Sequence, residues 1–206
     1  MLQHPTIPQG FRMGAVKAGI KPSGGLDLAI LVSDRSCSCA GTFTLNRIAA
    51  APVQWDRVLL PSQSIRAVVI NAGNANAATG AQGLANARRT AELAASLLDC
   101  QPNDVLVAST GVIGHQLPMA KLEAGMAALV PSLGSSPELL DLTSRAILTT
   151  DTVPKVVARE LMLGDRTVRL LDARGRHRLL RFSGAFSKLH GGVVWPEGLP
   201  GVGPDT

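Results

Sequence analysis

The chain has 206 residues, of which 46% are hydrophobic and 17% are charged, so it can bury a substantial core and is neither a coiled coil nor a disordered charged tail. Aromatic residues make up only 3% and tyrosine is absent, which argues against a platform of stacked rings for single-stranded nucleic acid. The formal net charge of +5 is largely local, since six arginines fall between residues 166 and 181, so nucleic-acid binding would rest on one short segment of a kind that usually forms a solvated face.

The first predicted elements lie between residues 1 and 53. Residues 1–25 are rich in Gly, Pro and Lys, and we expect irregular structure there. The segment LDLAILVS at residues 26–33 becomes continuously apolar, which predicts a strand buried on both faces. Two further short strands are expected at residues 41–44 and 51–53, on either side of a polar loop.

Strands and helices alternate in the middle of the chain. RAVVI at residues 66–70 predicts a strand, and the Asn-rich segment 71–76 is too turn-prone to continue it. Apolar residues at helical spacing predict a helix over residues 81–98. DVLVAS at residues 104–109 predicts the next strand.

The alternation continues after this strand. A glycine-punctuated loop at residues 110–114 leads to a helix that begins at Pro118 and ends near residue 130. Another helix is expected at residues 138–148 and another strand at 167–171. The pattern predicts an α/β architecture in which the Asn-rich and Thr-Gly loops both leave the ends of strands, where such folds commonly build sites.

The composition changes beyond Leu171. Residues 172–206 are rich first in arginine and then in glycine and proline, and they show no amphipathic period. We therefore predict one domain over residues 1–171 and a poorly ordered tail over residues 172–206.

The loop at residues 109–114 (STGVIG) is the best local candidate for a functional site. A hydroxyl beside a glycine N–H gives two donors that can converge on one oxygen, which is what an oxyanion hole requires. Glycine also permits close approach and unusual dihedral angles. The alternative is an ordinary glycine turn that joins a strand to a helix, and spacing alone favours this turn.

Two other polar segments allow both a functional and a structural interpretation. Asn71, Asn74 and Asn76 could present amides to a polar substrate, although asparagine also tolerates left-handed turns and caps backbone groups. The segment TTDT at residues 149–152 could contact a substrate, or its hydroxyls could satisfy the exposed carbonyls at the end of a helix.

The cysteines and histidines do not predict a metal site. Cys37 and Cys39 place two sulfurs on one strand face, but structural zinc needs four ligands and no matching pair occurs elsewhere. Buried cysteines usually act as small apolar residues. No signal peptide and no apolar run long enough for a spanning helix is recognised, so we expect a cytoplasmic protein with no membrane role.

Seven short segments occur in one consistent order: GFRMGAVKAGIKPSGGLDLAILVSDR, AGTFTLNR, APV, VVINAGNANAATG, STGVIG, LPMAKL and AILTTDTVPK. In this order they resemble the ornithine acetyltransferase family, also called bifunctional glutamate N-acetyltransferase or ArgJ. The likeness runs from about Gly10 to Arg169, and NAGNANAATG followed by STGVIG at this separation is a specific combination. The resemblance implies an α/β fold of mixed sheets with packed helices, equivalent to the α-chain half of the DmpA/ArgJ fold.

The resemblance also implies an activity in arginine biosynthesis. Family members cut themselves before a threonine, whose freed amino group and hydroxyl become base and nucleophile. This threonine takes acetyl from N-acetylornithine and passes it to glutamate without a metal or cofactor, with acetyl-CoA as a further acetyl donor in bifunctional members. By resemblance, Thr110 and Gly111 form the oxyanion hole and Thr152 contacts substrate, and the partner is a β chain in an α2β2 assembly.

The chain departs from the family pattern after Arg169. The family continues with a substrate-binding lysine and an Ala-Thr-Met-Leu cleavage segment, neither of which occurs here. Ungapped counting places the lysine position on Gly175 and the nucleophile on Phe186, and neither residue can perform those roles. We therefore expect no nucleophile in this chain, and a shifted reading frame or a truncated gene would explain the change.

Three functional interpretations follow. The first is an acetyltransferase by descent that holds the oxyanion half of a composite site and is inactive alone. The second is an inactive remnant or a module that binds acetylated amino acids. The third, nucleic-acid binding through the arginine cluster, predicts a steep loss of affinity with salt. Without a β chain we also expect an exposed sheet edge and a tendency to associate.

Overall fold

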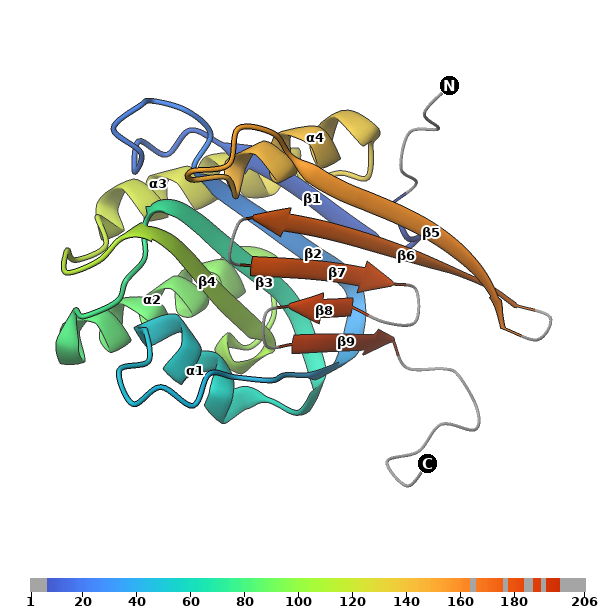
Figure 1. Cartoon of the computed structure of the whole chain (residues 1–206), viewed down its shortest axis with the longest axis horizontal. Helices are drawn as coiled ribbons and strands as arrows, with labels where there is room; N and C mark the ends of the chain where they lie inside the picture. The colour runs from blue at the N-terminus through green and yellow to red at the C-terminus, as the bar shows by residue number, and fades with distance from the viewer. Residues whose placement is uncertain (1–6, 164–165, 176–177, 184–186, 190–191, 197–206) are drawn as a thin grey trace.

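The structure is a computed structural model that describes residues 7–163, 166–175, 178–183, 187–189 and 192–196 (Figure 1). Its elements are β1 (Phe11–Val16), β2 (Leu28–Ala40), α1 (Ala51–Leu59), β3 (Ser62–Asn74), α2 (Gly80–Leu98), η1 (Pro102–Asp104), β4 (Val105–Val112), α3 (Met119–Leu129), η2 (Val130–Ser132), α4 (Pro137–Ala146), β5 (Lys155–Leu163), β6 (Arg166–Gly175), β7 (Arg178–Ser183), β8 (Ser187–Leu189) and β9 (Gly192–Pro196).

The larger sheet is mixed. Its strands run in the order β4-β3-β2-β9-β8, and β1 pairs with β2 away from this path. β2 is antiparallel to both β1 and β3, whereas β3 and β4 are parallel. A second sheet has the antiparallel order β5-β6-β7. The predicted α/β class, with mixed sheets and packed helices, is confirmed.

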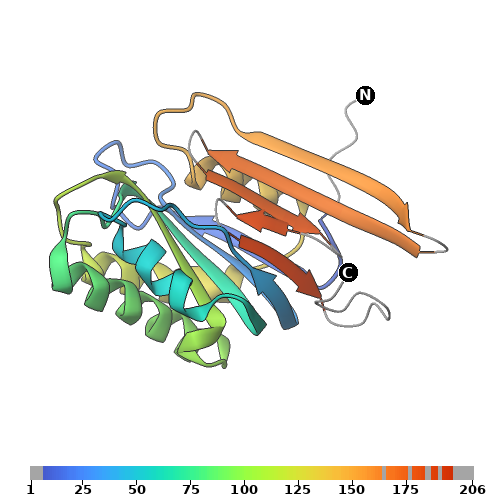
Figure 2. The same ribbon diagram turned by 60° about the horizontal axis from the view of Figure 1, so that its bottom comes forward.

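The larger sheet separates two apolar clusters. Successive residues of β4 point to opposite faces, because side chains of a strand alternate. Val105 and Val107 join the cluster that packs against α2 and α3, whereas Leu106 and Ala108 join the one that includes α4 and the β5–β6 hairpin. Figure 2 shows the two long helices on one side of the sheet and the hairpin on the other.

Several predicted elements match the structure closely. The expected helices at residues 81–98, 118–130 and 138–148 correspond to α2, α3 and α4, and the strands at 26–33 and 104–109 lie largely within β2 and β4. Each of these segments carries its own apolar periodicity or continuous apolar run.

Two expectations in the first quarter of the chain were wrong. Residues 11–16 form β1 rather than irregular structure, because Phe11 and Met13 are buried and the strand pairs along its whole length with β2. Residues 51–53 begin helix α1 rather than a strand. Pro52 lies in the first turn of that helix, where its fixed φ is favourable and its missing N–H costs nothing. The expected short strand at residues 41–44 is not formed.

The strand expected at residues 167–171 lies within β6, but the end of the chain also contains strands that the sequence did not predict. β5 was missed, β6 crosses the predicted boundary at Leu171, and β7, β8 and β9 lie within residues 172–206. Pairing along the β5–β6–β7 meander imposes strand structure on these segments without a strong local pattern. Residues 197–206 and the counted nucleophile position, Phe186, lie outside the described residues. The boundary at residue 171 stays a prediction.

Candidate functional site

The Asn-rich and Thr-Gly segments lie side by side at the carboxyl ends of the parallel strands β3 and β4. Ala72 is paired with Thr110 and Gly73 with Gly111, and Asn74 faces both Thr110 and Val112 across a register shift. The prediction that residues 71–76 end the strand was therefore wrong as far as Asn74. Parallel pairing with β4 holds this turn-prone sequence extended, and the irregular register begins only at Gly73 and Asn74.

Gly111 is held in a position that only glycine fits. Its φ is +136°, a conformation that residues with a side chain rarely adopt. A Cβ at this residue would lie 2.3 Å from the carbonyl carbon of Gly73 and 2.5 Å from the nitrogen of Asn74. Both neighbours are backbone atoms of the adjacent strand, so the contact cannot be relieved by a side-chain rotation. The positive-φ conformation of Gly111, near the end of β4, is thus fixed by β3.

Asn74 fastens the segment that follows Gly111. Its Nδ2 donates to the carbonyl oxygens of His115 and Gln116, each at 3.1 Å. Its Oδ1 accepts from the backbone N–H of Asn76 at 2.8 Å, and its own carbonyl accepts from Asn71 Nδ2 at 2.8 Å. A buried amide with these partners stabilises the loop rather than offering donors to a ligand.

Further polar side chains extend this network to α2. Asn76 Nδ2 donates to the carbonyl of Gly83, and Thr79 Oγ1 donates to Asn76 Oδ1, both at 2.8 Å. Gln116 Nε2 donates to the carbonyl of Thr79 at 2.9 Å, and Asn86 Nδ2 donates to Gln116 Oε1 at 3.1 Å. For Asn71, Asn74 and Asn76 the structural interpretation is therefore correct, since these amides shape the loop around Gly111.

Ser109 and Thr110 carry neighbouring hydroxyls on opposite faces of β4. By strand alternation Ser109 shares the face of Val107, which packs against the helices, and it is fully buried. Its Oγ has no hydrogen-bond partner within the described part of the chain. Thr110 shares the face of Ala108 and is only half-buried. Of the two residues, Thr110 is therefore the more exposed one.

A loop near the N-terminus packs against the same strand ends. The carboxylate of Asp27, which is fully buried, accepts from the backbone N–H groups of Ala18, Ile20 and Lys21 at 2.6, 2.5 and 2.8 Å. A Cβ at Gly73 would lie 3.1 Å from the Cα and Cγ of Lys21. Lys21 therefore sits directly against the residue that pairs with Gly111.

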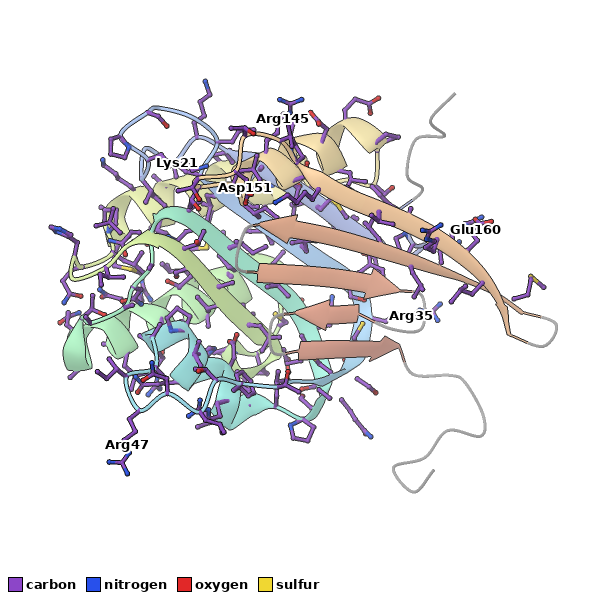
Figure 3. All side chains as sticks on the ribbon, in the orientation of Figure 1. Lys21, Arg35, Arg47, Arg145, Asp151 and Glu160 are labelled. Carbon is purple, nitrogen blue, oxygen red and sulfur yellow. The ribbon has the colours of Figure 1, made fainter. Side chains whose placement is uncertain are left out.

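Thr152 lies in the loop between α4 and β5 and is exposed. α4 ends at Ala146, so the TTDT segment follows the helix rather than ending it, contrary to the sequence expectation. Figures 1 and 2 both show this loop at the end of the molecule where β3 and β4 terminate. Asp151 in the same loop pairs with Lys155 at 2.7 Å, and Figure 3 labels Asp151 and Lys21. Thr110 and Gly111 are thus adjacent, and Thr152 belongs to a separate loop at the same end.

The outer edge of β4 is partly covered by α1. Trp55 Nε1 donates to the carbonyl of Val105, and the N–H of Val107 donates to Asp56 Oδ1, both at 3.0 Å. These side chains satisfy backbone groups that an edge strand otherwise exposes. In the described topology β4 ends its sheet, so the remaining open part of the edge is the part nearest Gly111.

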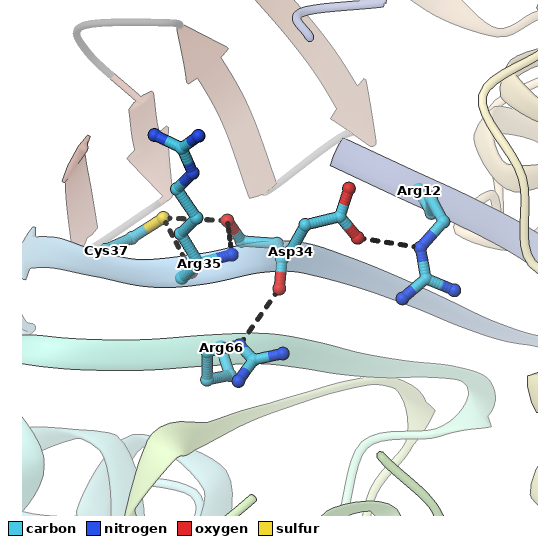
Figure 4. Close-up of polar contacts among 6 residues, drawn as sticks. Arg12, Asp34, Arg35, Cys37 and Arg66 are labelled. Atoms are coloured by element: carbon cyan, nitrogen blue, oxygen red, sulfur yellow. Dashed lines mark hydrogen bonds and ion pairs between the residues drawn. The ribbon is translucent and has the colours of Figure 1, made fainter. Parts of the chain in front are cut away.

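The cysteines form no metal centre within the described residues. No group of three or more His, Cys, Asp or Glu side chains there could hold a metal ion. The Sγ of Cys37 lies 3.1 Å from the Oγ of Ser33, and Arg12 forms an ion pair with Asp34 at 2.8 Å. Figure 4 shows Cys37 and this ion pair along the same stretch of β2. Burial raises the pKa of the Cys39 thiol to about 12, which leaves it unreactive at neutral pH.

Two other features that bear on the sequence predictions are a membrane span and the arginine cluster. Among the described residues no helix is long and apolar enough to cross a membrane. The arginine cluster falls on β6 and β7 with one member, Arg176, outside the described residues, and Arg169 pairs with Glu160 at 2.7 Å.

The geometry around Thr110 and Gly111 suits the stabilisation of a developing negative charge. A half-buried threonine and a glycine N–H follow each other near the end of β4, and an oxyanion hole needs donors that are held in place in advance. Sequence reasoning found these residues, but it missed Lys21 and Asp27, whose only signal was an isolated pair of charges in a glycine-rich segment.

Comparisons with known proteins show which family the chain resembles. The sequence model of the ArgJ family matches residues 12–174. The arginine biosynthesis bifunctional protein ArgJ of Thermus thermophilus is 49% identical over 170 residues, which are 82% of this chain and 43% of that protein. The protein of the same name from Geobacter sulfurreducens is 48% identical over 151 residues, 73% of this chain and 38% of its own length. The chain thus spans about two fifths of the length of these curated relatives.

A solved structure covers the chain almost completely. The ornithine acetyltransferase of Mycobacterium tuberculosis, complexed with ornithine, superposes with a TM-score of 0.71 and 33% identity, covering 99% of this chain and 97% of the matched chain. The ArgJ protein of Bacillus halodurans gives a TM-score of 0.69 at 27% identity.

Proposed function

Because the chain belongs to the ArgJ family, we propose that it is the α-chain half of an acetyltransferase that transfers acetyl from N-acetylornithine to glutamate in arginine biosynthesis. In this proposal Thr110 and Gly111 form the oxyanion hole and Thr152 contacts the substrate. The observation that supports it most is the conformation of Gly111, which is fixed at a positive φ against the backbone of β3 and directly follows the half-buried Thr110.

The proposed chemistry divides between two polypeptides. A threonine hydroxyl on the partner attacks the acetyl carbonyl carbon, and the charge that develops on the carbonyl oxygen is stabilised by Thr110 Oγ and the N–H of Gly111. The partner's α-amino group takes the proton of the attacking hydroxyl and passes it to ornithine as the amide C–N bond breaks. In the second half-reaction the amino group of glutamate attacks the acyl carbon, the ester C–O bond breaks, and a proton from the glutamate amine passes through the α-amino group to the threonine oxygen. The same two donors stabilise the second oxyanion.

The partner that we propose is a β chain like that of the family. Apolar side chains remain exposed on the described surface near the site, among them Val112 and Ile113, which are 58% and 63% exposed directly after Gly111. Exposed apolar residues at the open end of an edge strand suit an interface with another polypeptide. We propose a cytoplasmic reaction that needs no metal or cofactor, with acetyl-CoA as an additional donor substrate.

The proposal is tested by reconstitution. The full chain is co-expressed with the part of the T. thermophilus relative that lies C-terminal to the matched segment, and acetyl transfer from N-acetylornithine to glutamate is measured. We expect transfer with both polypeptides present and none with this chain alone. A stable complex that cannot transfer acetyl would refute the proposal, and activity of the chain alone would refute the assignment of the nucleophile to the partner.

A further inference from the structure

Lys21 contacts two segments that are far apart in the sequence. Its Nζ donates to the carbonyl of Leu26 at 2.6 Å and to the carbonyl of Ala146, the last residue of α4, at 3.2 Å. The base of its side chain packs against Gly73, which is paired with Gly111. One side chain therefore joins the end of α4 to the strand ends that carry the candidate oxyanion hole.

The backbone of Lys21 is itself held firmly. Asp27 accepts from three N–H groups of the loop, including that of Lys21 at 2.8 Å, and the N–H of Ala72 donates to the Asp27 carbonyl at 2.8 Å. A buried carboxylate with several N–H donors is a strong anchor, because each is a charge-assisted hydrogen bond. The loop is thereby bonded to β3 at Ala72, one residue before Gly73, so the backbone of Lys21 is held in place relative to this strand.

The side chain of Lys21 holds the C-terminal end of α4 through its hydrogen bond to the carbonyl of Ala146. The last carbonyls of a helix lack partners within the helix, and a cation there also interacts favourably with the helix dipole. The segment that follows Ala146 runs directly into residues 149–152, the TTDT loop. An ammonium that bonds this carbonyl therefore fixes the beginning of the loop that carries Thr152.

We propose that Lys21 is a positioning residue for acetyl transfer, which holds the Thr152 loop at a set distance from Thr110 and Gly111 through its hydrogen bond to Ala146. This inference rests on the proposed function. Burial lowers the pKa of Lys21 from its ordinary value, while the charge of Asp27 acts in the opposite direction. An ammonium that is partly withdrawn from water needs hydrogen-bond acceptors, and the carbonyls of Leu26 and Ala146 supply them to Lys21. Lys17 in the same loop is exposed, so water can solvate its ammonium.

The test compares Lys21→Met with Lys21→Arg and with the matched control Lys17→Met, all in the reconstituted complex. Methionine keeps the packing against Gly73 but loses the ammonium. We therefore expect the KM for N-acetylornithine to rise about tenfold while kcat changes less than about twofold, the signature of lost binding contacts away from the oxyanion hole. Lys21→Arg restores donors and should recover part of the KM, and Lys17→Met should match the wild type.

A second measurement uses the chain alone. Hydrogen exchange followed by mass spectrometry should show faster exchange in residues 147–154 of Lys21→Met, with β2 and α2 unchanged, and no such change in Lys17→Met. An unaltered KM, an Arg variant no better than Met, or a uniform increase of exchange across the chain would each overturn the inference. If the wild-type complex transfers no acetyl, the proposed function fails, whereas the exchange result still decides whether Lys21 holds the loop.

Discussion

Replacing Gly111 by alanine should damage both the stability and the chemistry of the site. The new Cβ would lie 2.3 Å from the Gly73 carbonyl carbon, 2.5 Å from the Asn74 nitrogen and 2.6 Å from the Gly73 carbonyl oxygen. These are backbone atoms, which a side-chain rotation cannot move, so the ends of β3 and β4 must separate to relieve the contact. The positive φ of +136° adds a conformational cost that alanine must also bear.

The magnitude follows from these two effects. Strained backbone costs about 1–3 kcal/mol and overpacking about another 1–3 kcal/mol, which together predict a loss of about 2–6 kcal/mol. In the reconstituted complex the N–H of residue 111 should move away from the oxyanion, and kcat should fall by about 10²–10³. Denaturant unfolding of the chain and steady-state kinetics of the complex measure the two effects separately.

Gly114→Ala is the matched control for this substitution. Gly114 also has a positive φ, of +80°, but no atom lies within 4 Å of its hypothetical Cβ. The control should therefore show only the conformational cost of about 1–2 kcal/mol. If Gly111→Ala is no more destabilising than Gly114→Ala, the close approach of β3 does not constrain Gly111 and our reasoning about the site is wrong.

Two further predictions concern the surroundings of the site and the core. Asn74→Asp replaces the donor to the carbonyls of His115 and Gln116 by an acceptor, so the free energy of unfolding, measured with denaturant, should fall by about 1–3 kcal/mol. The control Asn103→Asp changes an exposed residue and should alter the free energy of unfolding by less than about 0.5 kcal/mol. An equal effect of both substitutions would contradict the assigned network. Burial raises the pKa of the Cys39 thiol from 9.0 to about 12, so between these pH values the folded state keeps a proton that the unfolded chain releases. The contribution of Cys39 to the free energy of unfolding is therefore fully present below pH 9 and is lost as the pH rises from 9 to 12. Cys39→Ala should therefore flatten the fall of stability over that range by up to about 1.4 kcal/mol per pH unit, and an unchanged slope would show that Cys39 is not responsible.

The parts of the fold that the sequence predicted are those with local signals. α2, α3 and α4 carry apolar residues at helical spacing, and β4 begins with a continuous apolar run, so their bounds could be read within a few residues. β5 gives no such signal, because its apolar residues do not alternate with polar ones. Val156 and Ala158 pack against the core, but Val157, Leu161 and Met162 are apolar and exposed. Its strand structure depends on pairing with β6, which no local pattern reports.

The candidate site divides in the same way. Thr110 and Gly111 could be recognised from a short glycine-containing segment and from the family resemblance. The contact that fixes Gly111 joins it to Gly73 on a parallel neighbour, and the bond from Lys21 to Ala146 spans 125 positions. Such non-local contacts depend on sheet order and on the packing of loops, so they emerge only from the structure. The asparagines illustrate the converse, since the sequence left two interpretations open and the hydrogen bonds of Asn74 decide between them.

The central claim is that the hydroxyl of Thr110 stabilises the acyl oxyanion, and kcat of the reconstituted complex with Thr110→Val tests it most directly. Valine keeps the shape of threonine but removes the donor, so kcat should fall by about 10²–10³. Thr110→Ser should retain most of the activity, and so should Ser109→Ala, because the neighbouring hydroxyl is buried on the helix side of β4. A Thr110→Val complex that transfers acetyl at the wild-type rate would contradict the account.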